Sequence, residues 1–185
     1  TRLRGLINIF DKRILAEDGH LKLFFDNDWN CNYDIFSYGH DIEASWLLHE
    51  AALVLGDKEW LERIESRLPS IVVAATEGFT PEGGMIYEKC GDEIDGDRHW
   101  WVQAEAAVGY FNLWEHFGAG EGLENALHCW EFIKAGLVDR ENGEWFWSVR
   151  TDGTVNRDDD KAGFWKCPYH NSRMCLEIIE RTESI

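Results

Sequence analysis

The sequence predicts an all-α fold in which helical hairpins follow one another and close into an α/α toroid, with short β-hairpins between the repeats. Three observations support this prediction. The chain resembles itself at an offset of about 62 residues, its apolar residues recur with helical spacing, and glycine-rich segments separate the helical stretches. Its 185 residues, of which 44% are hydrophobic, suffice for the core of a single domain over residues 1–185.

The internal repeat has two clear copies of its helical part and three of its glycine-rich part. The aligned segments are Glu43-Ala44 with Glu105-Ala106, Gly56 with Gly118, and 83–88 with both 142–147 and 18–25. Self-similarity at a fixed spacing is typical of supersecondary units that stack on one another.

The first half of the chain is predicted to hold three helices. One covers residues 3–15, and the next carries an apolar stripe from Ile42 to Leu55. Gly56 ends that helix, and Asp57 is a suitable N-cap for a third helix, whose stripe runs to Val72. Pro69 lies inside the third helix, where we expect a kink or an early end.

The second half repeats this order. Apolar stripes predict helices over 104–113 and 123–133, and a further helix begins near Pro168, a residue favoured in the first helical turn. Alternating apolar residues in the two later glycine-rich segments predict short hairpins. These residues are Met85 and Tyr87 in one segment and Trp145 and Trp147 in the other.

Polar and aromatic residues recur at the start of the first helix of every repeat. They are His40, Asp41 and Glu43, then His99, Trp100, Trp101, Gln103 and Glu105, then Tyr169, His170, Asn171 and Arg173. In a toroid these helix ends converge on one face, so the repeat predicts a single shared pocket. Helix N-termini carry partial positive charge, which favours a developing oxyanion there.

Two histidines in this set are candidates for proton transfer, because imidazole titrates near neutral pH. His40 and Glu43 share one helix face, and Glu43 could orient the imidazole or bind a hydroxyl group; a simple capping role for Asp41 or Glu43 is the alternative. His170 has Arg173 on the next helical turn, and the alternative for this histidine is a satisfied core position. Four further histidines lack such neighbours and are expected to be ordinary surface or core residues: His20, His49, His116 and His128. His99 is intermediate, because it adjoins the Trp100-Trp101 pair.

Ten tryptophans are present, and most of them are expected to fill the core. Trp100 and Trp101 point about 100° apart on a helix, so we expect at most one to face the core while the other lines the pocket.

Charge and cysteine content exclude several classes of protein. The net charge of −17 disfavours nucleic acid and anionic membrane surfaces as partners, and no apolar run is long enough to span a bilayer. The five cysteines include no C-x-x-C pair, which argues against a disulfide framework or a zinc site and favours reduced thiols in a cytoplasmic protein. No metal ion or cofactor is expected.

Three segments closely resemble the cellobiose 2-epimerases, which belong to the N-acylglucosamine 2-epimerase superfamily. They are SYGHDIEASWL from Ser37, HWWVQAEA from His99 and GFWKCPYHNSRMC from Gly163. The resemblance extends over essentially the whole chain. It implies an (α/α)6 barrel of twelve helices, of which this chain supplies about six, as the C-terminal half.

The resemblance also implies a reaction: inversion of C2 in the reducing-end glucose of a disaccharide such as cellobiose. His40 and His170 would be the acid/base pair, one on each face of an enediolate. Arg173 would stabilise the enediolate oxygens, Glu43 and Glu105 would hold sugar hydroxyls, and aromatic rings would stack on the sugars. Those rings belong to Trp100, Trp101 and Trp165.

Other functions stay open at this point. An N-acylglucosamine 2-epimerase or a mannose isomerase would use the same scaffold. An α/α-toroid glycoside hydrolase would need two carboxylates across a glycosidic bond. A non-catalytic carbohydrate-binding fragment is a third possibility. Half a toroid exposes an apolar edge, so we expect an upstream half or a second copy to cover it.

Overall fold

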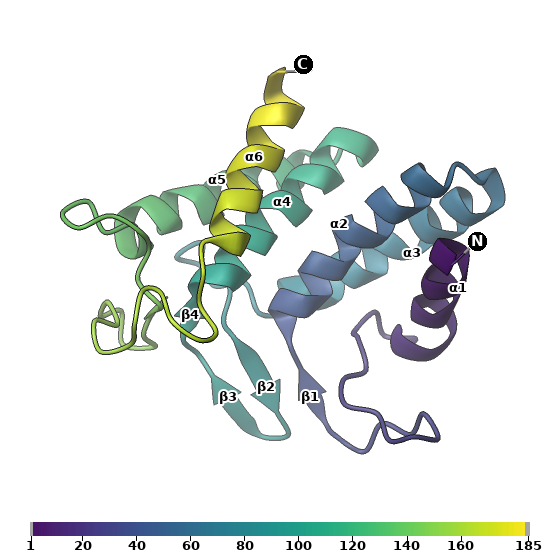
Figure 1. Cartoon of the computed structure of the whole chain (residues 1–185), viewed down its shortest axis with the longest axis horizontal. Helices are drawn as coiled ribbons and strands as arrows, with labels where there is room; N and C mark the ends of the chain where they lie inside the picture. Colours follow the sequence, from purple (N-terminus) through teal and green to yellow (C-terminus); the bar gives the residue numbers. More distant parts are fainter. Residues whose placement is uncertain (1, 184–185) are drawn as a thin grey trace.

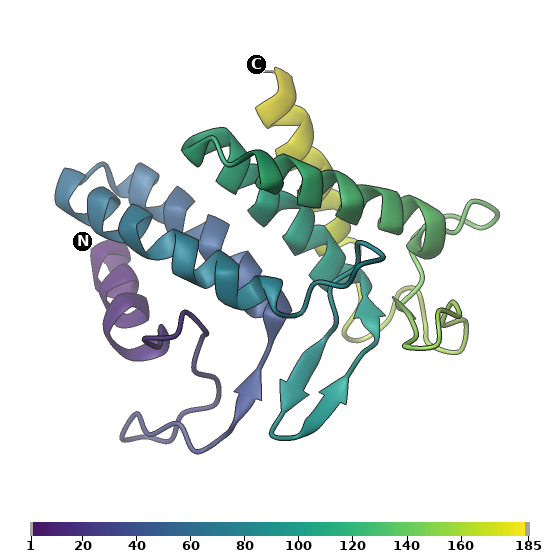
Figure 2. The ribbon, with the colours of Figure 1, turned by 180° about the vertical axis from the view of Figure 1, so that it is seen from behind.

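A computed structural model describes residues 2–183, which form six α-helices and five short strands. Three helices lie side by side in Figure 1: α2 (Tyr38–Leu55), α4 (Trp100–Phe117) and α6 (Tyr169–Glu183). The view from behind shows α3 (Lys58–Thr76) and α5 (Gly120–Phe132) covering them as a second layer (Figure 2). The helix α1 (Arg2–Ile9) packs on α2. Alternating inner and outer helices are the arrangement that the repeat predicts.

The hairpin repeat is visible in the helix ends. Both inner helices of the complete repeats end at a left-handed glycine, Gly56 with φ +66° and Gly118 with φ +67°. This conformation favours glycine and satisfies the last carbonyl groups of a helix. Asp57 then caps α3, because its side chain accepts a hydrogen bond from the Trp60 amide. The predicted breaks and caps are therefore confirmed.

Pro69 does not end its helix, so the expectation of an early end is wrong. The helix α3 continues to Thr76. Proline removes one backbone hydrogen bond within a helix. Leu68, Ile71 and Val72 are all buried around it, and their packing holds the helix together.

The outer helices α1 and α5 each end in a π-helical turn, over Phe10–Ile14 and Ile133–Leu137. The segments that follow the outer helices make equivalent antiparallel bridges, Leu15 to Leu21, Phe79 to Met85 and Val138 to Trp145. Each turn contains a glycine with positive φ, namely Gly19, Gly83 and Gly143. The glycine-rich segments thus form tight turns closed by a single bridge, where the sequence predicts hairpins.

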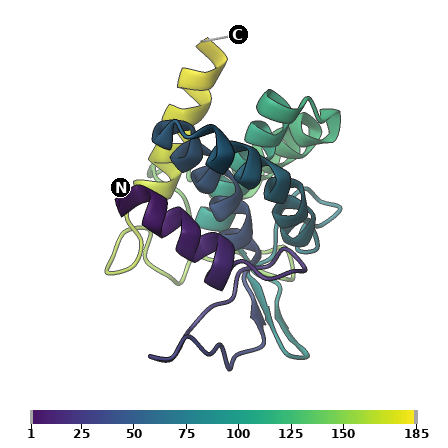
Figure 3. The ribbon, with the colours of Figure 1, turned by 90° about the vertical axis from the view of Figure 1, so that its right-hand side faces the viewer.

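The regular strands lie at one end of the helices. β1 (Ile35–Phe36), β2 (Glu88–Cys90) and β3 (Glu93–Asp95) form an antiparallel sheet in that order, with Ile35 opposite Cys90 and Lys89 opposite Ile94. β4 (Arg98–His99) pairs with β5 (Ser148–Val149). Figure 3 shows these segments at the end opposite the C-terminus of α6. The inner helices begin at the strand end, so their first turns meet there.

Two apolar clusters hold the layers together. The larger is centred on α4 and includes Trp46, Val108 and Met174, and the smaller joins α1, α2 and α3 around Ile7, Leu48 and Ile64. No helix within residues 2–183 combines the length and the hydropathy that crossing a bilayer requires. All five cysteines are unpaired.

Candidate active site

A cleft of about 520 Å³ opens where the inner helices begin. Its lining comes from the starts of α2, α4 and α6, from the glycine-rich turns and from the loop before α6. The lining residues are His40, Glu43, Tyr87, His99, Trp100, Trp101, Trp147, Trp165 and His170. Six of the eight predicted site residues therefore share one cleft; Glu105 and Arg173 lie directly behind it.

His40 stands in the first turn of α2. Its Nδ1 atom lies 2.7 Å from the Ser37 hydroxyl oxygen, and its ring packs on Trp101 with the centroids 4.8 Å apart. Desolvation by the surrounding cleft lowers the pKa of His40, and a positive charge on His170 lowers it further, while Asp41 opposes both. The pKa of His40 therefore lies below its ordinary value, which favours the neutral ring.

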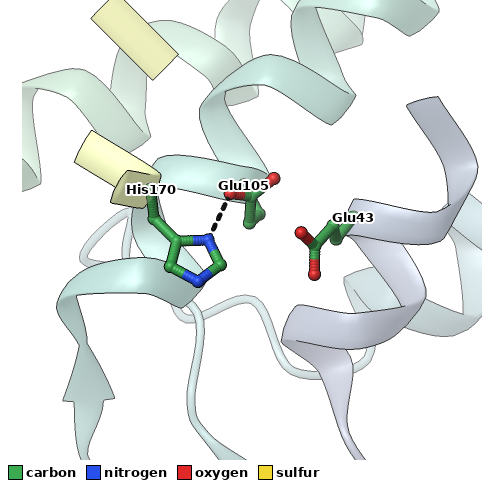
Figure 4. A group of neighbouring side chains, drawn as sticks. All are labelled: Glu43, Glu105 and His170. Carbon is green, nitrogen blue, oxygen red and sulfur yellow. Dashed lines mark hydrogen bonds and ion pairs between the residues drawn. The ribbon is translucent and has the colours of Figure 1, made fainter. Parts of the chain in front are cut away.

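His170 faces the same tryptophan from α6. Its Nδ1 atom lies 2.7 Å from Oε1 of Glu105, an interaction drawn in Figure 4, and its ring centroid is 5.6 Å from that of Trp101. The carboxylate accepts a hydrogen bond from the Nδ1–H group, so in the neutral ring Nε2 carries a lone pair. Both candidate bases thus hold Nδ1 against a protein partner and leave Nε2 for the cleft.

Glu105 anchors this arrangement from α4. Its side chain is 1% exposed, and Trp46 Nε1 donates to its Oε2 at 3.0 Å. Its Oε1 accepts from His170 and from Arg173 Nη2, the latter at 2.7 Å. Both oxygens are therefore satisfied within the protein, so Glu105 orients His170. Its predicted contact with a sugar hydroxyl stays a prediction.

Arg173 links the two glutamates. Its Nη2 group binds Glu43 as well as Glu105, and its guanidinium lies over the rings of Trp46, at 4.9 Å, and Tyr169, at 4.5 Å. Burial raises the pKa of Glu43, and the charge of Glu105 raises it further, while Arg173 opposes both. The guanidinium thus balances two carboxylates that would otherwise repel each other.

The arrangement of charges bears on metal binding. Ligand atoms of Glu43, Glu105 and His170, the side chains drawn in Figure 4, lie within 4.8 Å of one another. A divalent cation at this position would have to displace the Arg173 guanidinium from both carboxylates. The three residues are therefore better suited to hold protons and hydrogen bonds than a metal ion.

The aromatic walls differ in exposure. Trp100 and Trp101 are both buried and both line the cleft, so the expected division between core and pocket is wrong. The reason is that every residue from Trp100 to Asn112 is buried, since α4 is the central helix. Trp165 is 80% exposed and lies in the loop that precedes α6.

Sequence reasoning missed two residues of the cleft, Tyr87 and Trp147, whereas it placed His99 in the shared pocket. Tyr87 and Trp147 occupy the same position, two residues beyond the bridging Met85 and Trp145, so the repeat contained a signal for both. His99 stacks on Tyr87 with the centroids 4.1 Å apart. His20 is a core residue, as one of the two expectations has it, and its Nδ1 lies 2.7 Å from Oδ2 of Asp41.

Comparisons with known proteins give consistent results. The family profile of N-acylglucosamine 2-epimerase (GlcNAc 2-epimerase) matches residues 3–173. Cellobiose 2-epimerase of Bacteroides fragilis is 60% identical over 96% of this chain and 46% of its own length, and that of Ruminococcus albus is 44% identical over 87% and 42%. A crystal structure of a sugar epimerase from a ruminal bacterium superimposes with a TM-score of 0.93 at 39% identity, over 97% of this chain and 47% of its own.

These matches confirm the predicted (α/α)6-barrel fold. The chain spans about half the length of the curated relatives that it matches.

Proposed function

The chain belongs to the N-acylglucosamine 2-epimerase family, and on that premise we propose that it forms the C-terminal half of a sugar 2-epimerase acting on a β-1,4-linked disaccharide. The reaction would invert C2 of the reducing-end glucose, converting cellobiose to glucosyl-mannose. The cellobiose 2-epimerase of Bacteroides fragilis, which is 60% identical, supports this choice of substrate.

One observation carries the proposal: two imidazoles pack against the same Trp101 ring and both line the cleft. Inversion at a carbon requires a proton to leave from one face and another to arrive on the opposite face. Two separate acid/base groups perform both steps without moving the sugar, and each contributes about 10²–10⁴-fold to such a reaction.

The chemistry begins with opening of the reducing-end ring, because the C2 proton is acidic only beside the C1 aldehyde. Nε2 of one histidine removes that proton, and the electron pair moves into an enediolate. The second histidine, in its protonated form, delivers a proton to C2 from the other side. After the reaction the first histidine is protonated and the second is neutral, and proton exchange with solvent restores the starting state.

The partners at Nδ1 give the two rings different characters. Glu105 is an acceptor only, so it holds His170 in the tautomer whose Nε2 is a base. The Ser37 hydroxyl can donate or accept, so it accommodates both neutral tautomers and the protonated form of His40. We propose that this difference lets the pair work in both directions.

The remaining predicted residues would hold the sugar. Glu43 is half-buried and lines the cleft, where its carboxylate can accept from a hydroxyl group. Trp100, Trp101 and Trp165 provide apolar faces for the two rings of a disaccharide. Arg173 binds Glu43 and Glu105, so we propose that it stabilises the enediolate indirectly, by neutralising negative charge on these two carboxylates.

A glycoside hydrolase is less consistent with this geometry. It would need Glu43 and Glu105 on opposite sides of a glycosidic bond, about 5–9 Å apart. The same nitrogen of Arg173 binds both, and Glu105 is 1% exposed. A mannose isomerase or an N-acylglucosamine 2-epimerase would use the same two histidines, and only the substrate test separates them.

Two apolar surfaces fit the proposal of an upstream half. One cavity of about 560 Å³ lies between α1 and α2, beside the exposed Leu6, Phe24 and Leu47. Another of about 590 Å³ lies along α5 and α6, beside the exposed Leu127 and Ile179. We propose that the upstream half covers both. If so, light scattering should show that a chain with both halves is a monomer and that this chain alone self-associates.

The test is exchange in D₂O followed by NMR, with cellobiose, mannose and N-acetylglucosamine as substrates. It uses this chain and a longer chain that carries the upstream half. Deuterium at C2 together with a glucosyl-mannose signal supports the proposal, and His170→Asn should abolish both. His128→Asn is the matched control, because His128 is exposed on α5 outside the cleft. Glucose release, or turnover of only the other sugars, would overturn it, and folded but inactive proteins would favour a binding role.

A further inference from the structure

Lys166 carries a fully buried ammonium group four residues before His170. Its side chain is 0% exposed, and lysine is almost never buried to this extent without partners. Its Nζ atom donates to Oε1 of Glu144 at 3.0 Å and to the carbonyl oxygens of Trp145 and Lys161, both at 2.8 Å. An ammonium group has three protons to donate, and all three are used.

Glu144, the partner of Lys166, is itself held in an uncommon conformation. Its φ angle of +60° is in the left-handed region, which non-glycine residues adopt only where their surroundings fix them. The same Oε1 atom that binds Lys166 also accepts from Asn171 Nδ2 at 2.9 Å. One carboxylate oxygen thus joins the loop before α6 to the first turn of α6.

These contacts lie on both sides of His170, the candidate base, in the sequence. Lys166 precedes His170 and Asn171 follows it directly, and both converge on the turn that contains Glu144. The ammonium also lies 5.2 Å from the ring centroid of Trp100, which forms a wall of the cleft. The loop that carries Trp165 and the first turn of α6, which carries His170, are therefore fastened to the fold through a buried charge close to the cleft.

We propose that Lys166, Glu144 and Asn171 form a positioning site that fixes the His170 imidazole against Glu105 and sets the path of the Trp165 loop. The catalytic consequence rests on the proposed function, whereas the placement of the ring does not. Lys166 acts through His170, since a side chain with no exposed surface cannot touch a sugar. A buried ammonium held by three acceptors in a fixed arrangement suits this task, because two acceptors belong to the turn at Glu144 and Trp145 and the third, the Lys161 carbonyl, belongs to the loop before α6.

The variants isolate the charge pair. Lys166→Met removes the ammonium and keeps an unbranched chain of similar length, and Glu144→Gln keeps an acceptor for Asn171 while removing the negative charge. The double variant measures the coupling between them. Lys134→Met is the matched control, because its ion pair with Glu131, at 2.7 Å, is exposed and involves none of the residues around Lys166.

The first readout needs no substrate. The ¹⁵N and ¹³C signals of the His170 ring report its tautomer, and the wild-type ring should show a proton on Nδ1 from the bond to Glu105. We expect Lys166→Met to shift these signals toward a mixture of tautomers, Glu144→Gln to do so less, and Lys134→Met to leave them unchanged. The second readout is C2 exchange by the longer chain, where we expect kcat to fall at least tenfold with a smaller change in KM.

A folded Lys166→Met protein with wild-type His170 signals would overturn the proposal. If this variant does not fold, Glu144→Gln decides the question on the same signals, because it preserves shape and the Asn171 contact. Shifted signals without C2 exchange in any variant, the wild type included, would support the positioning site and overturn the proposed function. If the variants keep the wild-type His170 signals but lose C2 exchange, the positioning site is overturned and the proposed function is not.

Discussion

Replacement of Glu105 by glutamine should weaken the fold and the proposed reaction together. Glutamine has the same shape, but one carboxylate oxygen becomes an NH₂ group. Glu105 accepts three hydrogen bonds, from Trp46 on one oxygen and from His170 and Arg173 on the other. If the amide oxygen faces His170 and Arg173, its NH₂ group meets the Trp46 N–H, and two donors oppose each other.

The size of the effect follows from these contacts. The lost bond to Trp46 is neutral on the donor side and is worth about 1 kcal/mol. Bonds to charged groups contribute about 1.5–3 kcal/mol and neutral ones about 0.5–1.5, so each bond to His170 and Arg173 weakens by about 1 kcal/mol. The free energy of unfolding should therefore fall by about 3 kcal/mol, at the lower end of the range for breaking a buried pair. Solvent screening does not reduce this value, because the Glu105 side chain is 1% exposed.

Urea denaturation measures this loss, with an unchanged slope as the sign that both proteins unfold alike. The control is Glu43→Gln, which weakens one bond from Arg173 to a half-buried side chain and should cost about 1 kcal/mol. In the longer chain, Glu105→Gln should also lower kcat for C2 exchange by about 10²-fold or more, since His170 loses its orienting carboxylate. A Glu105→Gln protein within about 1 kcal/mol of wild type, with unchanged kcat, would refute the role assigned to Glu105.

Three further changes probe other parts of the molecule. The pKa of His40 lies below its usual value, first through desolvation and also through the charge of His170, so His170→Asn should raise it; an NMR titration in which the pKa of His40 stays or falls would contradict this. Gly39→Ala places a Cβ atom 2.6 Å from the Trp101 ring, which must shift, so we expect a loss of about 1–3 kcal/mol in urea and altered Trp101 signals; an unchanged spectrum would show that the ring is not held where we describe it. Arg181→Met removes the cation that binds Glu50, Glu115 and Glu177, and we expect a loss of about 2 kcal/mol, below the range for fully buried pairs because these carboxylates are 22–39% exposed. The His170 signals should not move in Arg181→Met, and a shift would mean that the two ends of the inner helices are coupled.

The sequence predicts the helices well because each carries its own local signals. Apolar spacing, the left-handed Gly56 and Gly118 and the Asp57 cap are properties of neighbouring residues. Pro69 shows the limit of such signals, since local rules end a helix that tertiary packing continues to Thr76. The convergence of helix starts on one cleft was also predictable, because it follows from the repeat itself.

The finer structure of the site depends on contacts between distant segments. Nothing near Glu105 in the sequence indicates that Trp46, His170 and Arg173 will all donate to it. Lys166 looks like an ordinary surface lysine until the turn at Glu144 covers it. The hydrogen bond between His20 and Asp41, which lie 21 positions apart in the sequence, likewise forms only when the chain folds. Long-range pairing of this kind has no periodic signature along the chain.

Glu43 and Glu105 occupy the same position in successive repeats, and one guanidinium from the next repeat holds both. If the repeats arose by duplication, the copied carboxylate created a charge conflict that a single arginine resolved, and the two glutamates were then free to diverge, one toward the cleft and one into the core. Evolutionary change at these three positions should therefore be correlated. A descendant that loses Arg173 is expected to lose one of the two carboxylates as well, and the retained one should reveal which glutamate the protein needs more.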